Sequence, residues 1–230
     1  MADSKFGASL VASFSMIVMS EIGDKTFLIA AIMSMTHGRW TVFFASLSAL
    51  ALMTVLSTGF GLVFPHFFSK TVTKWIAAVL FAVLGLKMVA DGVKMSSNQL
   101  QEEYEQVASE LDADPGVSPL AQKAGHMESA VSISSSKSTA IAIDPIFYKI
   151  ATLTFVAEWG DRSQIATIAL AAAQNAVGVT MGAVAGHAVC TLMAVVCGQI
   201  LSRWVSIKTV TISGGFMFVV FSVFTALGLM

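Results

Sequence analysis

Six long stretches of apolar residues run along the chain, separated by short polar segments and by one long one. A helix needs about 20 apolar residues to cross roughly 30 Å of hydrocarbon. The stretches that reach this length cover residues 6–35, 41–64, 71–92, 146–174, 177–201 and 209–229. They predict six transmembrane helices. A transmembrane barrel would instead need alternating segments of ~10 residues, and the sequence lacks this alternation.

The composition agrees with a membrane setting. Hydrophobic residues make up 56% of the chain and charged residues 12%, and the mean hydropathy is +0.78. Such a chain cannot hide its apolar surface from water by folding alone. We therefore expect an all-α integral membrane protein that contacts the lipid bilayer and binds no nucleic acid. The first apolar stretch runs far beyond the core of a signal peptide, so we interpret it as a membrane span.

A polar segment at residues 95–144 divides the chain into a first membrane part, residues 1–94, and a second, residues 145–230. The segment is rich in Ser, Glu, Asp and Gln and poor in aromatic residues. This composition predicts a disordered cytosolic linker, with a short helix through "QEEYEQVASEL". The stretch "SISSSKS" is either part of this tether or a phosphorylation patch.

The two membrane parts repeat one another in sequence. "EIGDKT" at residues 21–26 aligns with "EWGDRS" at residues 158–163, and "KTVT" occurs at both 70–73 and 208–211. Because each part holds three predicted spans, the second part must enter the membrane from the opposite side. The chain therefore predicts two inverted three-helix repeats, an architecture typical of secondary transporters.

Basic residues in the short loops predict the orientation, because cytoplasmic loops carry more Lys and Arg. Six basic residues lie on the side of the linker: Arg39, Lys87, Lys94, Lys149, Arg203 and Lys208. Three lie on the other side: Lys5, Lys70 and Lys74. The linker is therefore expected in the cytosol, with both termini in the lumen or outside.

Acidic residues occupy the middle of the first and fourth apolar stretches. In one continuous helix, Glu21, Asp24 and Lys25 would share a face, at spacings of three and four residues. Glu158 and Asp161 repeat the pattern in the second part. Each ionisable group at the bilayer centre costs ~2.5–3.5 kcal/mol. We therefore expect the two motifs to meet near the midplane, where their charges compensate one another.

The charge of the paired motifs suggests what binds there. Four carboxylates against Lys25 and Arg162 leave two surplus negative charges, which one divalent cation or two protons can neutralise. Carboxylate and hydroxyl oxygens suit hard ions such as Ca2+ and Mn2+, and a Cys/His cluster for zinc is missing from the sequence. We predict a site for a transported cation with these ligands: Glu21, Asp24, Thr26, Glu158, Asp161 and Ser163.

Neighbouring residues receive supporting roles in this interpretation. Lys25 and Arg162 are expected to hold the carboxylates ionised and in position. Gly23 and Gly160 would let each helix loosen, so that backbone carbonyl groups can join the site.

Other positions allow more than one interpretation. Gln164 either orients a carboxylate or packs against its neighbours. His187, inside the fifth stretch, is a proton relay, a cation ligand or a buried histidine bonded to a backbone carbonyl. Gly182 and Gly186, four residues apart, predict a close contact between helices.

The two motifs resemble the paired E-x-G-D-[KR]-[ST] signatures of the family catalogued as uncharacterised protein family 0016, the Golgi-type antiporters of Ca2+ and Mn2+ against protons. The similarity includes "SEIGDKTF", "LTFVAEWGDRSQ", "GHAVCT" and "KTVTISGG". The resemblance implies the six-span inverted repeat, an acidic site at Glu21, Asp24, Glu158 and Asp161, and cation import into the secretory pathway in exchange for protons. Since a plastid transit peptide is not visible, the Golgi membrane is the expected location.

We therefore expect a transporter and not an enzyme, with no catalytic residue and no resident cofactor. Divalent cations and protons are its expected substrates. The sequence is compatible with a homo-oligomer and does not decide the oligomeric state. Three alternatives remain: an exporter of a small organic cation, a non-transporting membrane scaffold, and a membrane enzyme that holds a metal between its carboxylates.

Overall fold

A computed structural model describes residues 2–95, 102, 105–109, 111, 145–204 and 207–228, and all regular secondary structure in this part of the chain is helical. The long helices are α1 (Ala2–Glu21), α2 (Lys25–Thr36), α3 (Arg39–Phe67), α4 (Lys70–Lys94), α7 (Pro145–Glu158), α8 (Arg162–Ala173), α9 (Ala176–Trp204) and α10 (Ile207–Leu227). The predicted all-α class is confirmed.

Four of these helices, α3, α4, α9 and α10, are long and apolar enough to cross a membrane. Helices α1 and α2 form a fifth candidate span, which bends by 68° at a short break. Helices α7 and α8 have 14 and 12 residues, too few to cross a bilayer singly, and their pair is not among the candidates found in the described residues. The structure thus supports a multi-pass membrane protein, while the count of six spans stays a prediction.

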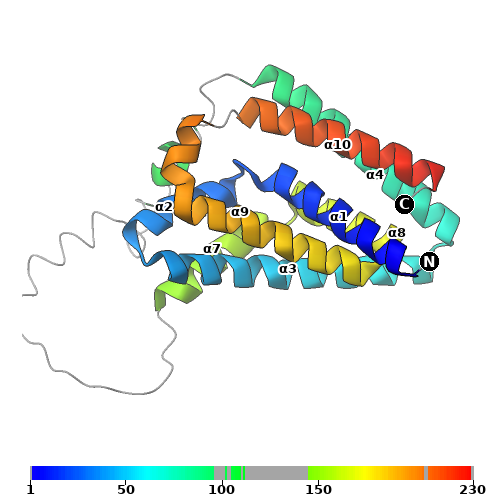
Figure 1. Ribbon diagram of the computed structural model, residues 1–230, viewed down its shortest axis with the longest axis horizontal. Helices are drawn as coiled ribbons and strands as arrows, with labels where there is room; N and C mark the ends of the chain where they lie inside the picture. Colours follow the sequence, from blue (N-terminus) through cyan, green and yellow to red (C-terminus); the bar gives the residue numbers. More distant parts are fainter. Residues whose placement is uncertain are drawn as a thin grey trace, which may run out of the picture.

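The helices pack in a way that follows the internal repeat (Figure 1). Helix α3 packs on α7 and α8, just as α9 packs on α1 and α2, and α3 and α9 contact each other. Helices α4 and α10 lie side by side along one edge of the molecule, against α8 and α1. Both chain ends lie at the same end of the bundle, opposite the end from which the linker leaves.

Glycines bring several helices into close contact. A Cβ atom on Gly182 would collide with the backbone of Leu10 in α1, and one on Gly186 would come within 2.9 Å of Ile17. Gly85 of α4 and Gly215 of α10 face each other, since a Cβ on either would lie within 2.8 Å of the other's carbonyl oxygen. Small residues permit such approach where lipid gives no hydrophobic force between helices. The close contact predicted for Gly182 and Gly186 is confirmed.

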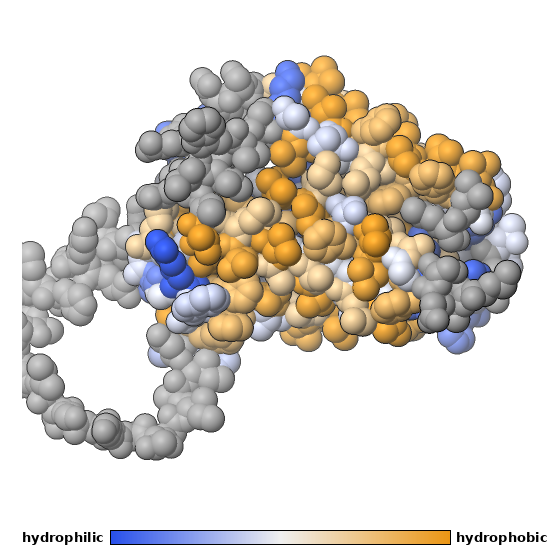
Figure 2. All heavy atoms as spheres, in the orientation of Figure 1, coloured by the Kyte–Doolittle hydropathy of each residue, from blue (hydrophilic) through white to orange (hydrophobic). Residues whose placement is uncertain are grey.

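The outer surface is apolar, as a bilayer requires. Figure 2 shows hydrophobic side chains across most of the visible face, with hydrophilic ones gathered mainly toward its edges. Three exposed Trp and Tyr side chains lie near helix ends, with Trp40 and Tyr148 on the linker side and Trp75 on the other. Trp and Tyr favour the membrane–water interface, so these residues are placed where such anchors belong.

Part of the linker packs on the membrane helices. Glu102, residues 105–109 and Leu111 are helical, as the short predicted helix requires. Val107 and Leu111 are buried in a cluster formed with α2, α3, α7 and α9. The expectations of disorder and of a phosphorylation patch concern linker residues that lie outside the described part of the chain.

Replacing Gly182 by alanine tests the contact between α1 and α9. The new Cβ would meet backbone atoms, which cannot move aside as a side-chain end can, so we expect a loss of ~1–3 kcal/mol in stability. Thermal unfolding of the purified protein in detergent should occur at a lower temperature than for the wild type. Gly59→Ala is the matched control, because Gly59 also lies inside a long helix but nothing lies within 4 Å of its Cβ position. Equal melting temperatures for the two variants would contradict the contact.

Candidate functional site

The first acidic motif lies at the break between α1 and α2. Glu21 is the last residue of α1, and Gly23 has a φ of 82°, in the left-handed region that favours glycine. The amide nitrogen of Asp24 donates to the carbonyl oxygen of Glu21 at 3.1 Å. The Asp24 carboxylate then accepts from the amide of Lys25 at 2.8 Å and caps α2. The motif therefore ends one helix and starts the next.

The second motif repeats this geometry between α7 and α8. Glu158 ends α7, Gly160 has a φ of 80°, and the amide of Asp161 donates to the carbonyl of Glu158 at 3.1 Å. The Asp161 carboxylate caps α8 by accepting from the amide of Ser163 at 3.1 Å. The loosening expected at the two glycines is thus a break in each helix.

The expectation that Glu21, Asp24 and Lys25 share one face of a continuous helix is wrong. The left-handed glycine turns the chain between the two acidic residues, so Glu21 and Asp24 belong to different helices. Lys25 becomes the exposed first residue of α2. The side chains are therefore grouped by the meeting of two breaks, and not by helical periodicity.

Hydroxyl groups connect the two repeats reciprocally. The Thr26 hydroxyl of α2 donates to Oε1 of Glu158 in the other repeat at 2.6 Å. The Ser163 side chain of α8 lies beside the Glu21 carboxyl group. Each glutamate therefore lies next to a hydroxyl side chain of the other repeat.

Three carboxyl groups form a compact cluster. Oxygens of Glu21, Glu158 and Asp161 lie within 4.8 Å of one another, a spacing suited to one shared cation. Glu21 is only 2% exposed and Glu158 3%. Two such carboxylates side by side away from water repel each other unless a proton or a cation lies between them. The cluster can therefore hold either a proton or a hard divalent ion between the same oxygens.

Arg162 of the second repeat contacts the first repeat at Asp24, which is not one of the three clustered carboxyl groups. Its Nη2 atom lies 3.8 Å from Oδ2 of Asp24 and donates to the carbonyl oxygen of Ser20 at 3.3 Å. A cation near the end of α1 suits the negative end of the helix dipole. Lys25 differs from Arg162 in position, because it is an exposed residue at the start of α2; the role expected for it stays a prediction.

Two further residues of the sequence interpretation lie beside the cluster. Gln164 accepts a hydrogen bond from the amide of Gly160 at 2.7 Å and donates to the sulfur of Met53 at 2.9 Å, so it supports the break between α7 and α8. His187 is buried in α9 and lines a small cavity together with Glu21.

A larger cavity connects the motifs with the linker side. It has a volume of about 440 Å³, and its wall includes Asp24, Asp161, Arg162 and, from α4, Lys87 and Asp91. It extends to the residue that caps α4 where the linker begins. The sequence interpretation counted Lys87 only as a loop charge and missed Asp91. The signal was present, because ionisable residues in an apolar stretch usually face a cavity.

Two substitutions of Asp161 separate its capping role from its charge. Asparagine also caps helices, whereas alanine does not and typically costs ~0.5–2 kcal/mol. We therefore expect Asp161→Ala to melt at a lower temperature than the wild type, and Asp161→Asn to melt close to it, in the same detergent and at the same pH. Equal destabilisation by both substitutions would show that the charge, and not the cap, stabilises the fold.

Comparison with known proteins shows the family to which the chain belongs. A family model described as divalent cation/proton antiporter GDT1 matches residues 9–96 and 146–229, which leaves out the linker. GDT1-like protein 3 of Arabidopsis thaliana is 44% identical over 224 residues, covering 96% of this chain and 71% of the relative. GDT1-like protein 4 of Oryza sativa subsp. indica is 46% identical over 212 residues, covering 92% and 70%.

The divalent cation/proton antiporter GDT1 of Saccharomyces cerevisiae is 35% identical over 232 residues, covering 93% of this chain and 81% of the yeast protein. No solved structure matches the chain. The family resemblance drawn from the two motifs is confirmed, since the matched residues contain both helix breaks and the carboxyl cluster. The chain belongs to the GDT1 family of divalent cation/proton antiporters.

Proposed function

We propose that this protein exchanges Ca2+ or Mn2+ for protons at the cluster of Glu21, Glu158 and Asp161. The observation that carries the proposal is the cluster itself, three carboxyl groups within 4.8 Å at the meeting point of two broken helices. Its donors are oxygens, which suit Ca2+ and Mn2+. The Thr26 hydroxyl holds Glu158 in place, and Thr26 and Ser163, which lies beside Glu21, offer further oxygen ligands.

The same cluster explains an exchange of ions. Three ionised carboxylates repel one another in a buried site, so they need either protons or a cation between them. Glu21 and Glu158 are close enough to share a proton when no cation is bound. A divalent ion that binds these oxygens takes the place of the protons, and protons returning to the carboxylates release it. The carbonyl ends of α1 and α7 point toward the same place, which favours a cation there.

The cavities support an alternating-access mechanism that is open to the linker side in this state. The 440 Å³ cavity leads from the motifs toward the linker. Toward the other side, the helices are closed by fully buried apolar side chains that include Met16, Ile17, Leu170 and Phe218. In the proposed cycle, the ion enters from the linker side and leaves after this apolar seal has opened.

We propose a six-span inverted repeat with a first part at residues 1–94, a linker at 95–144 and a second part at 145–230. The broken pair α7 and α8 has the same geometry as α1 and α2, so we count each pair as one span. The two chain ends lie at one end of the molecule, which fits an even number of crossings. The excess of basic residues favours a cytosolic linker and lumenal termini, and the family resemblance favours the Golgi membrane.

Transport by purified protein in liposomes tests the proposal. We expect Ca2+ or Mn2+ uptake coupled to an opposed proton flux, measured with an ion indicator and a pH dye. Glu21→Gln and Glu158→Gln remove charges that both ions need, so each should reduce both fluxes by at least about tenfold, a loss of ~1.4 kcal/mol or more in binding. Glu102→Gln is the control, because Glu102 is an exposed carboxylate of the linker. It should transport like the wild type.

The other function classes give different results in this assay. Cation flux that survives in Glu21→Gln and Glu158→Gln would remove these residues from the site. A wild-type protein that moves an organic cation but neither metal would be an exporter, and one that moves no ion would fit a scaffold or an enzyme.

A further inference from the structure

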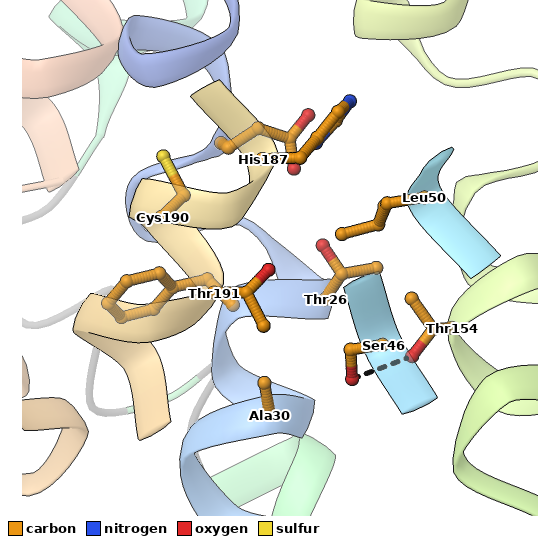
Figure 3. A pocket seen from close by; sticks show the side chains of 10 residues that line it. Thr26, Ala30, Ser46, Leu50, Thr154, His187, Cys190 and Thr191 are labelled. Atoms are coloured by element: carbon orange, nitrogen blue, oxygen red, sulfur yellow. Dashed lines mark hydrogen bonds between the residues drawn. The ribbon is translucent and has the colours of Figure 1, made fainter. Parts of the chain in front are cut away.

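Glu21 lines a small cavity, drawn in Figure 3. It shares no lining residue with the larger cavity that leads to the linker side. Its volume is about 10 Å³, enough for one water molecule or one bare ion. Residues from α1, α2, α3, α7 and α9 line it, and six of them carry polar side chains: Glu21, Thr26, Ser46, Thr154, His187 and Thr191. So many polar groups around so small a space are unusual within an apolar bundle.

Two residues that line this cavity each have a buried side-chain atom without a hydrogen-bond partner. The atoms are Oε1 of Glu21 and Nδ1 of His187, in residues that are 2% and 5% exposed. A buried acceptor or donor without a partner destabilises a fold. An occupant of the cavity that binds both atoms would remove this cost, so the two unpartnered atoms point to a ligand there.

The remaining polar groups complete a set of ligands. The Thr26 hydroxyl donates to Glu158, which leaves its own oxygen lone pairs available and connects the small cavity with the carboxyl cluster. Thr154 donates to Ser46 at 3.3 Å, the contact drawn as a dashed line in Figure 3. Thr191 lies one turn of α9 beyond His187, on the same side of the helix.

We propose that this cavity is a second station for the transported cation, in which Glu21 supplies an oxygen ligand and His187 a nitrogen ligand, and that His187 favours Mn2+ over Ca2+. The inference rests on the proposed function. Ca2+ takes oxygen ligands, whereas imidazole nitrogen binds first-row transition ions. Glu21 belongs to both the carboxyl cluster and this cavity, so an ion can pass from one to the other without losing that ligand.

The ratio of Mn2+ to Ca2+ transport tests the role of His187. In liposomes with equal concentrations of the two ions, His187→Gln should lower this ratio about tenfold, because the amide supplies an oxygen where the imidazole supplied nitrogen. Thr73→Val is the matched control. Thr73 also carries a buried hydroxyl without a partner, but it lies in α4, outside this cavity. Its ratio should equal that of the wild type.

Spectroscopy of the wild type tests the ligand directly, even if His187→Gln does not fold. Pulsed electron paramagnetic resonance of Mn2+ bound to the purified protein should show coupling to an imidazole nitrogen, and this coupling should disappear in His187→Gln. Bound Mn2+ without nitrogen coupling in the wild type, an unchanged coupling in the variant, or an unchanged ratio of transport would each overturn the inference. The cavity would then hold a water molecule only.

Failure of this inference differs from failure of the proposed function. If the wild type transports neither ion, the proposed antiport is wrong. If it transports both and His187→Gln keeps the wild-type ratio, antiport at the carboxyl cluster is still supported. Only the proposed second cation site in the small cavity is then contradicted.

Discussion

Burial of carboxyl groups in the middle of an apolar bundle is the constraint on which the rest of this structure depends. A carboxylate removed from water needs partners close by, and neither repeat supplies all of them. The Thr26 hydroxyl donates to Glu158, and the Ser163 side chain lies beside Glu21, so each glutamate has a hydroxyl neighbour from the other repeat. Arg162 crosses in the same way to Asp24. The site is therefore complete only when the two repeats are packed, so folding and ion binding depend on the same contacts.

The spacing within each motif has a backbone reason as well as a chemical one. Glutamate ends one helix, glycine takes a left-handed conformation, and aspartate caps the next helix. These are separate requirements of a helix break, and they fall on neighbouring residues. Asp161 has both a structural and a chemical role, because its carboxylate caps α8 and also belongs to the carboxyl cluster.

Much of this could be read from the sequence, because apolar length, composition and the repeated motif depend on local pattern. The all-α class, the residues of the cluster and the contact at Gly182 needed nothing more. Gly23 and Gly160 indicated that each helix loosens, but the extent of the break was hidden, since the apolar stretch continues through it and a positive φ has no hydrophobic signature. The different positions of Lys25 and Arg162 were hidden too, because aligned residues of a repeat look equivalent until packing separates them. The burial of Val107 depends on contacts far away in the sequence.

Packing also departs from the symmetry of the repeat, and this departure bears on transport. Helix α4 packs on α8 and α10 packs on α1, while the open cavity lies between α4 and the two motifs. Under the proposed inverted repeat, the opposite-facing state would arise when the two halves exchange conformations. The exchanged contacts would be α10 on α2 and α4 on α7. The glycine contact between Gly85 and Gly215 holds α4 and α10 together, so in the proposed cycle this pair would move as one body across the two broken helices, closing one cavity as it opens the other.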